Sequence, residues 1–280
     1  MKLEKKVKQT LEKINLNKRL SRSGSSKSQS KEKILVALSG GKDSAVVAFI
    51  LKKLGYNFEA LYVDLCVGEY SKKCLKKIQE LCEKLKIKLH IYDLKKQQGK
   101  SMLQIWKKTN KQNLNHCSAC GIIKKWVLNK KARELKADKI ITGHNIDDEI
   151  QTFLINIFKG SLKLSTNAGV ITKNISNKKF IPRIKPLYYI FEEDVLKYAL
   201  KNKIPFLKGK CPYAETSYRI EVRDFLEKVS RKEKLNIMKN FEKNYPKIEK
   251  LKKGNLNYCE ICGEPCRRRI CKRCELMKIK

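Results

Sequence analysis

Short runs of apolar residues alternate along the chain with stretches whose apolar positions recur at helical spacing. The runs predict strands at residues 34–38, 58–64, 88–94 and 139–142. The patterns between and after them predict helices at 43–54, 71–86, beyond residue 117, at 147–158 and, after an extended stretch at 179–187, at 191–202 and 215–229. This β–α repetition is typical of an α/β fold with a parallel, doubly wound sheet. Ligands of such sheets bind beyond the carboxyl ends of the strands, so residues that follow a strand are the first candidates for a site.

The two ends of the chain differ from this central pattern. Residues 4–20 carry apolar residues at helical spacing, and residues 21–30 form a Ser-rich stretch typical of a flexible linker. The last 30 residues hold five cysteines and nine Lys and Arg. We therefore expect three units: a basic N-terminal helix and linker (1–30), a main domain (31–250) and a small C-terminal module (251–280).

The chain carries a large excess of positive charge. It has 65 Lys and Arg against 28 Asp and Glu, a formal net charge of +37. An excess of this size points to a polyanionic partner, and a nucleic acid fits better than a membrane because no basic amphipathic helix with exposed aromatic residues stands out. No apolar run of about 18 residues predicts a membrane span, and the charged residues 1–6 do not resemble a secretory signal. A cytoplasmic location is expected.

The sequence Ser39-Gly-Gly-Lys-Asp-Ser44 connects the first predicted strand to the first predicted helix. Its glycines allow a tight turn, while the two serine hydroxyls and the N–H groups of the helix N-terminus can bind phosphate. Asp43 inside this turn is explained if a magnesium ion lies between its carboxylate and the phosphates. An ordinary strand–turn–helix connection would not need all of these residues, so we interpret the loop as a nucleotide site.

A second motif, Gly143-His-Asn-Ile-Asp-Asp148, follows the strand predicted at 139–142 and opens a helix. Acidic residues in a first helical turn also fit the helix dipole alone. Together with the upstream loop, however, Asp147 and Asp148 are better interpreted as groups that hold magnesium or assist the reacting centre.

The eleven cysteines include three Cys-x-x-Cys pairs, which in an intracellular protein indicate metal or redox chemistry. The pair Cys117 and Cys120, with Cys211, suits zinc, a redox pair or iron–sulfur ligation. Three thiolates without an evident fourth favour a 4Fe–4S cluster with one open iron. The other two pairs predict a closed tetrahedral zinc site in the C-terminal module, made by Cys259, Cys262, Cys271 and Cys274.

In order and chemistry, the motifs resemble the TtcA/TtuA group of tRNA 2-thiolation enzymes within the PP-loop ATP pyrophosphatase superfamily. The resemblance extends over about residues 31–230 and is greatest to the TtuA-like and cytosolic thiouridylase branch. The motifs that carry it are Ser39-Gly-Gly-Lys-Asp-Ser44, Cys117-Ser-Ala-Cys-Gly121, Gly143-His-Asn-Ile-Asp-Asp148, Pro182-Arg-Ile-Lys-Pro-Leu187 and Cys211-Pro-Tyr213 with Ser217, Arg219 and Arg223. Members of that branch usually carry an N-terminal zinc finger as well, whereas this chain has no cysteine before Cys66.

The resemblance implies an adenine nucleotide alpha hydrolase-like fold and a site for ATP and Mg²⁺. Nucleotide-binding residues are then Ala37, Ser39, Gly40, Gly41, Asp43, Ser44, Val63, Asp64, Lys124, Gly143 and Asp147. Lys124 is a candidate phosphate contact. In so basic a chain, a solvent-exposed lysine without a functional role is a strong alternative. The catalytic residues implied are Asp148, Cys117 and Cys211, and the 4Fe–4S ligands are Cys117, Cys120 and Cys211.

The predicted function is ATP-dependent 2-thiolation of a tRNA pyrimidine, with adenylation of its 2-oxygen followed by entry of sulfur. The partners expected are tRNA and a sulfur donor, for which the resemblance suggests a ubiquitin-like carrier; the sequence leaves a homodimer open. A tRNA lysidine synthetase is the rival enzyme, but it has no need of the three cysteines. A zinc-ribbon RNA-binding protein without activity is the other rival, and the intact Asp43, Ser44, Asp147 and Asp148 argue against it.

Overall fold

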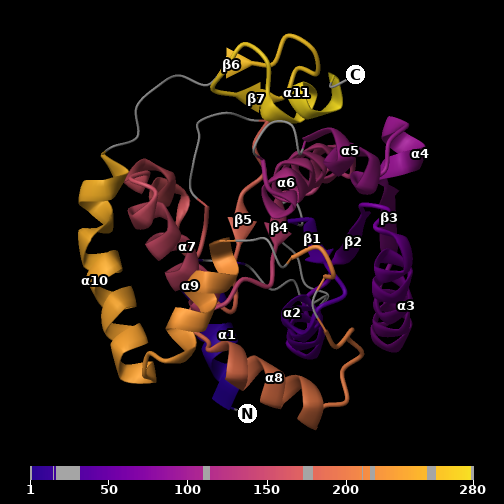
Figure 1. Cartoon of the computed structure of the whole chain (residues 1–280). Coiled ribbons are helices and arrows are strands. Elements are labelled where there is room, and N and C mark those ends of the chain that lie inside the picture. The colour runs from indigo at the N-terminus through magenta and orange to yellow at the C-terminus, as the bar shows by residue number, and fades with distance from the viewer. Residues whose placement is uncertain are drawn as a thin grey trace, which may run out of the picture.

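Five parallel strands form the central sheet, in the order β3-β2-β1-β4-β5 (Figure 1). The computed structural model describes residues 2–14, 16, 32–109, 114–172, 179–209, 211–214, 218–250 and 257–278. The strands are β1 (Ile34–Leu38), β2 (Glu59–Asp64), β3 (Leu89–Asp93), β4 (Lys139–Ile141) and β5 (Arg183–Ile184). The predicted doubly wound parallel sheet is thereby confirmed. The predicted linker at 21–30 lies outside the described residues.

Strand β1 lies at the centre of the sheet because its side chains are apolar on both faces, as in other parallel sheets. Leu35 and Val36 are fully buried, on opposite faces. The strand order reverses at β1, since β2 and β3 lie to one side and β4 and β5 to the other. A ligand crevice is therefore expected where β1 ends, directly before Ser39.

Helices cover both faces of the sheet (Figure 1). One face packs against α1 (Lys2–Lys13), α2 (Lys42–Lys53), α3 (Gly68–Leu85) and α8 (Glu192–Lys201). The other packs against α4 (Leu94–Gln98), α5 (Met102–Thr109) and α6 (His116–Glu134). Val7 and Leu11 of α1 are fully buried in the same core as α2, so the N-terminal helix packs directly on the main domain.

A third cluster of helices extends the domain beyond β4 and β5. It consists of α7 (Ile146–Phe158), the 3-10 helix η2 (Leu162–Asn167), α9 (Tyr218–Glu227) and α10 (Arg231–Glu249). The sequence patterns predicted α7, α8 and α9, but α4, α5, η2 and α10 were not foreseen. Met238, Phe241 and Ile248 bury one stripe of α10, and this spacing was the available signal.

The C-terminal module is a small hairpin followed by a helix. It contains β6 (Asn257–Tyr258), β7 (Pro265–Cys266) and α11 (Lys272–Lys278), and it lies over α5 and α6 (Figure 1). Leu276 is buried in the core beneath these helices, and the carboxylate of Glu264 accepts hydrogen bonds from the guanidinium of Arg133. The module is therefore fixed to α6 by a buried leucine and a charged pair.

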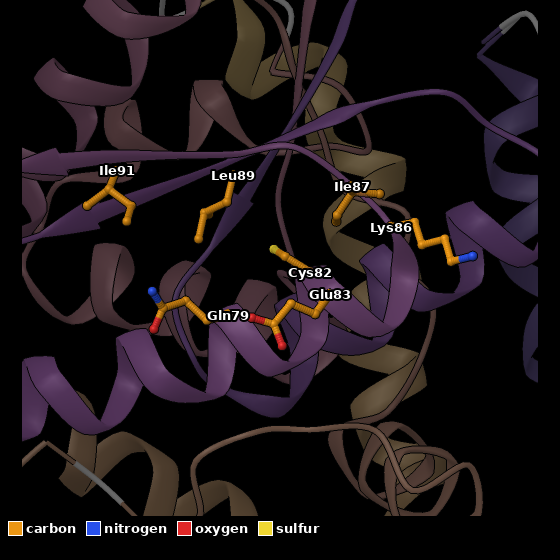
Figure 2. Close-up of a pocket in the computed structure, with 7 residues that line it drawn as sticks. All are labelled: Gln79, Cys82, Glu83, Lys86, Ile87, Leu89 and Ile91. Atoms are coloured by element: carbon orange, nitrogen blue, oxygen red, sulfur yellow. The ribbon is translucent and has the colours of Figure 1, made fainter.

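An open pocket of about 450 Å³ lies between α3 and the edge strand β3 (Figure 2). Leu89 and Ile91 face Gln79 and Glu83 across it, beside Cys82. None of its lining residues belongs to the motifs singled out in the sequence, so it is not assigned to the chemistry. In the described part of the chain, no helix is long and apolar enough to cross a membrane.

Candidate active site

The loop after β1 is shaped as the sequence predicted. Gly40 has a φ of +84°, and a Cβ there would lie 2.9 Å from the Cβ of Cys74 on α3, so only glycine fits the turn. Gly41 is the N-cap of α2 and no side chain caps this helix. The first N–H groups of α2 are consequently available to a phosphate.

Hydrogen bonds between the two serines connect the two ends of this loop. The Ser39 N–H donates to Ser44 Oγ at 3.2 Å, and the two hydroxyl oxygens are also 3.2 Å apart. Ser44 Oγ donates in turn to the Gly41 carbonyl at 3.1 Å. The hydroxyls thus lie together at the start of α2, as a phosphate-binding loop requires.

The second motif touches the loop directly. A Cβ on Gly143 would lie 2.5 Å from the Ser44 nitrogen and 2.7 Å from the Asp43 carbonyl carbon, which no side chain could tolerate. Asn145 Nδ2 donates to Asp43 Oδ1 at 3.2 Å, while Asn145 Oδ1 accepts from the Asp148 N–H at 3.0 Å. Asn145 therefore joins the carboxylate of the loop to the helix turn that carries Asp148.

The carboxylates of Asp43 and Asp148 lie close enough to influence each other. Burial raises the pKa of Asp43, Lys42 opposes this, and the charge of Asp148 raises it further. Burial likewise raises the pKa of Asp148, against the guanidinium of Arg219, whose Nη1 is 3.6 Å from Asp148 Oδ1. Two crowded carboxylates beside a phosphate loop are suited to a hard divalent cation.

Lys42 places a positive charge next to the carboxylate of Asp43. Its Nζ is 3.1 Å from Asp43 Oδ2 and 2.6 Å from Glu192 Oε1 on α8. Burial lowers the pKa of Lys42, but the two carboxylates outweigh it and leave the pKa raised. Lys42 is therefore a charged side chain held at the mouth of the loop.

Asp147 makes its contacts with α8 and α10 rather than with the loop. Its carboxylate accepts from the Glu192 N–H at 2.8 Å and pairs with Lys234 Nζ of α10 at 2.9 Å. The side chain is buried and ties α7 to α8 and α10. A role for Asp147 in binding the nucleotide remains a prediction.

Three of the predicted nucleotide-binding residues, Ala37, Val63 and Asp64, lie at or near the carboxyl ends of β1 and β2. Ala37 is paired in register with Leu61 of β2, and Val63 is buried beneath the carboxyl end of that strand. Asp64 Oδ1 accepts from the Cys66 N–H at 2.7 Å, which shapes the turn after β2. These residues therefore lie at the edge of the sheet where the fold predicts a ligand, and their contact with a nucleotide remains a prediction.

Cys117 and Cys120 lie one turn apart at the N-terminus of α6. Cys117 is exposed and Cys120 is half-buried. Asn115 caps this helix, with Oδ1 accepting from the Ser118 N–H at 2.8 Å. The pair is therefore presented on a well-defined first turn.

Aromatic rings bring the segment of Cys211 to the same place. The Tyr213 ring lies 4.8 Å from that of Trp106, centroid to centroid, and Trp106 Nε1 donates to the His116 carbonyl at 3.2 Å. Burial raises the pKa of Cys120 to about 12, Lys124 opposes this, and Cys117 and Cys211 add to the rise. Cys117, Cys211 and Lys124 therefore all lie close enough to Cys120 to influence its pKa.

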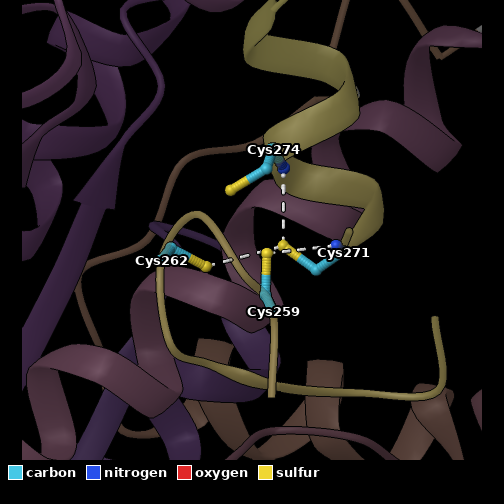
Figure 3. A group of neighbouring side chains, drawn as sticks. All are labelled: Cys259, Cys262, Cys271 and Cys274. Atoms are coloured by element: carbon cyan, nitrogen blue, oxygen red, sulfur yellow. Dashed lines mark hydrogen bonds between the residues drawn. The ribbon is translucent and has the colours of Figure 1, made fainter. Parts of the chain in front are cut away.

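The four C-terminal cysteines form a much tighter group (Figure 3). Their sulfur atoms all lie within 4.8 Å of one another, with 3.7 Å between those of Cys262 and Cys271. The Cys271 N–H donates to Cys259 Sγ at 3.3 Å, and the Cys274 N–H donates to Cys271 Sγ at 3.4 Å. Despite burial, N–H donors lower the pKa of Cys259, whereas burial raises the pKa of Cys271 and Cys274. Within the group, Cys259 is therefore the thiol most readily ionised.

Comparisons with known proteins bear on this arrangement. A family model described as the PP-loop domain matches residues 2–229. The chain belongs to this PP-loop family. It is 34% identical over 253 residues to a tRNA-5-methyluridine(54) 2-sulfurtransferase of Pyrococcus horikoshii, covering 89% of this chain and 79% of the relative. It is 31% identical over 257 residues to cytoplasmic tRNA 2-thiolation protein 1 of Caenorhabditis elegans, covering 88% and 67% respectively.

A solved structure is similar over almost the whole chain. It is the U34-tRNA thiolase NcsA of Methanococcus maripaludis with its 4Fe–4S cluster, at a TM-score of 0.78 and 29% identity. The match covers 98% of this chain and 86% of the other. The resemblance to tRNA 2-thiolation proteins that the sequence motifs indicated is thereby confirmed.

The two cysteine groups of this PP-loop protein differ in a way that fits different metals. A single tetrahedral zinc places its sulfur ligands about 3.8 Å apart, given Zn–S bonds of about 2.3 Å. The C-terminal four match that spacing, whereas Cys117, Cys120 and Cys211 do not converge within 4.8 Å in the described structure. A wider set of three thiols suits a larger, multi-iron group.

Three residues of the PP-loop site lie in motifs recognised from the sequence but were given no role of their own. Asn145 was recognisable, because an Asn followed three residues later by an acidic residue is a helix-capping pattern. Lys42 and Arg219 act through partners far away in sequence, and only folding reveals those contacts.

Proposed function

We propose that this chain is an ATP-dependent tRNA 2-thiolation enzyme that acts on a pyrimidine, which we expect to be uridine. The observation that carries the proposal is the position of Cys74. It packs against Gly40 of the phosphate loop, and the charges of Lys124 and Cys211 are among the influences on its pKa. Cys74 therefore connects the nucleotide loop to the three-cysteine group. Neither a lysidine synthetase nor an RNA-binding module needs that juxtaposition.

The names of the relatives support the reaction but differ on the position modified. One is a sulfurtransferase for 5-methyluridine 54, and the similar structure is a U34-tRNA thiolase. The proposal therefore names 2-thiolation and leaves the tRNA position to experiment.

The residues of the chain account for the first half-reaction. The N-terminus of α2 and the hydroxyls of Ser39 and Ser44 would bind the ATP phosphates, and Asp43 with Asp148 would hold Mg²⁺. The pyrimidine 2-oxygen attacks the α-phosphorus, and pyrophosphate leaves. Lys42, which lies beside Asp43, and Lys124 would offset negative charge that develops on the phosphates.

In the second half-reaction a sulfur nucleophile attacks carbon 2 of the adenylated base, and AMP leaves with the original oxygen. Cys117, Cys120 and Cys211 would hold a 4Fe–4S cluster, which when bound supplies an iron site for exogenous sulfur. The exposed position of Cys117 leaves that side of the group open to a donor. No oxidant is needed when sulfur arrives at the sulfide level, as from a thiocarboxylate.

The remaining assignments complete the proposal. Zinc on Cys259, Cys262, Cys271 and Cys274 would stabilise the C-terminal module, which is too small for an apolar core of its own. A ubiquitin-like carrier protein is the proposed sulfur donor, a homodimer is the assembly to test, and the name of the Caenorhabditis elegans relative supports a cytoplasmic location.

Pyrophosphate release separates this function from its rivals. With MgATP and unmodified tRNA, we expect pyrophosphate to form without added lysine. A lysidine synthetase would be stimulated by lysine, and a binding module would release no pyrophosphate. Absence of tRNA-dependent release, in protein whose thermal unfolding is cooperative, would overturn the proposal.

A further inference from the structure

Four cationic side chains lie close enough to His144 to lower its pKa. They are Lys125 of α6, Arg183 and Lys185 of the segment around β5, and Arg219 of α9. Burial and the charges of these four residues together lower the pKa of His144 to about 3. His144 is nevertheless exposed to solvent, as are Lys125 and Arg219, so a ligand can reach the cluster from solvent.

Only two of these four charges are balanced by a carboxylate. Lys185 Nζ pairs with Glu149 Oε1 at 2.7 Å in a buried contact, and Arg219 pairs with Asp148. Within the described residues, no acidic side chain lies within ion-pair distance of Lys125 or Arg183. Partial enclosure and the neighbouring cations lower the pKa of Lys125. Repulsion between partly buried cations is unfavourable unless an anion binds among them.

Arg183 has one buried nitrogen atom that lacks a hydrogen-bond partner among the described residues. Its Nη2 donates to the Lys125 carbonyl at 3.1 Å, which fixes the guanidinium against α6. Its Nε is shielded from solvent and has no hydrogen-bond partner among the described residues. A buried N–H donor without a partner is costly, and a phosphate oxygen is the partner that guanidinium groups match best.

We propose that Lys125 and Arg183, flanked by Lys185 and Arg219, bind a phosphate group of the substrates beside His144. In the proposed function, the ATP phosphates bind to the N-terminus of α2 and to the hydroxyls of Ser39 and Ser44. We therefore assign the site beside His144 to a backbone phosphodiester of the RNA next to the target pyrimidine. This inference deepens the proposed function and rests on it. The site would position the nucleotide relative to Asp148, through the Arg219 contact.

The test uses the full chain and three single variants. Lys125→Gln removes an exposed charge whose side chain makes no hydrogen bond or ion pair with the described residues, and Arg183→Gln removes the guanidinium. Lys76→Gln removes the same charge from an exposed position on α3 and is the matched control. Affinity for unmodified tRNA is measured over a series of KCl concentrations without ATP, and affinity for a non-hydrolysable ATP analogue with Mg²⁺ is measured separately.

For an RNA phosphodiester, Lys125→Gln and Arg183→Gln should each weaken tRNA binding about three- to tenfold and reduce the slope of log affinity against log salt by about one. Nucleotide affinity should not change, and Lys76→Gln should match the wild type in both. If these variants lose nucleotide affinity while the salt dependence of tRNA binding is unchanged, the site binds a phosphate of ATP. If Lys125→Gln behaves like Lys76→Gln in both measurements, the inference is overturned, even if Arg183→Gln fails to fold.

These binding readouts are independent of turnover. A wild-type protein that binds tRNA but forms no thiouridine would defeat the proposed function and leave the phosphate site to be judged on the variants. A wild-type protein that thiolates tRNA, with variants that bind as it does, would defeat the inference alone.

Discussion

Gly143 and Asn145 join the two motifs into one site, and the sequence predicted only part of this. The loop Ser39–Ser44 and the turn at Asp148 were recognisable because each follows a strand and opens a helix. The contact between Gly143 and Ser44 requires the register of neighbouring strands, which a sequence pattern does not contain. Asp147 and Asp148 are adjacent in sequence, yet they face different partners because successive helix positions are about 100° apart.

The first prediction concerns the carboxylates of Asp43 and Asp148. Asp43→Asn and Asp148→Asn should each abolish AMP formation, because a neutral amide cannot replace an anionic ligand of Mg²⁺. The pKa of each carboxyl is raised by burial, so ionised Asp43 and Asp148 contribute less stability once the pH rises through their folded-state pKa values. At neutral pH without nucleotide, the thermal midpoint of each Asn variant should therefore equal or exceed that of the wild type.

The same pKa shifts predict a pH dependence of activity. As the pH falls through the raised pKa values, the two carboxyls become protonated and lose Mg²⁺, so pyrophosphate release should decline at a higher pH than for an unperturbed aspartate. Near-wild-type turnover by either Asn variant would contradict the assignment.

The second prediction separates Asp147 from its neighbour. Asp147→Ala leaves Lys234 partly buried without its carboxylate and removes an acceptor from the Glu192 N–H. Loss of one partner of a buried pair costs about 3 kcal/mol, which urea unfolding can measure. Lys232→Ala, an exposed change on the same helix, should stay within about 0.5 kcal/mol. An Asp147→Ala protein of full stability that cannot turn over ATP would instead make Asp147 a ligand.

At the scale of elements, strongly periodic segments were predictable and irregular ones were not. The strands β1 to β4 are apolar runs bounded by polar residues, and their pattern alone identifies them. Helix α10 was missed because its sequence is mostly polar and contains Pro246, and its stability comes from a narrow stripe packed on α7. Short α4 and α5 depend on the capping contact of Asp93 and on burial of Trp106.

The third prediction concerns the helix turn and loop that carry the three cysteines. Cys117→Ser, Cys120→Ser and Cys211→Ser should each lose iron and thiolation, because a serine hydroxyl is a poor ligand for iron–sulfur clusters. Protein purified without oxygen should hold about four irons per chain, and tRNA-dependent pyrophosphate release should partly survive in the variants.

Cys266→Ser is the matched control for these variants. Cys266 lies outside both metal groups, with its thiol donating to the Arg268 carbonyl, a bond that a serine hydroxyl can replace. This variant should keep its iron. Wild-type protein that binds only zinc without oxygen, yet thiolates tRNA fully, would contradict the cluster and favour a persulfide route.

At the scale of the whole molecule, we expect the net charge and the C-terminal module to contribute to RNA binding. Arg267 and Lys272 are exposed on this module, which Arg133 and Glu264 fix to α6. The fourth prediction is that tRNA binding is steeply salt-dependent, as the net charge of +37 implies, and that Arg267→Gln with Lys272→Gln lowers the slope by about two. The measurement is affinity against KCl concentration. An unchanged slope would mean that the module does not contact the RNA backbone.

The most direct test of the central claim is the nucleoside content of the tRNA itself. Unmodified tRNA is incubated without oxygen with the purified chain, MgATP and sulfide, then digested and analysed by mass spectrometry, while AMP is measured in the same samples. We expect a 2-thiolated pyrimidine at one position, about one AMP for each sulfur incorporated, and neither product without ATP. ATP consumption in the presence of tRNA with no thiolated nucleoside would contradict the account.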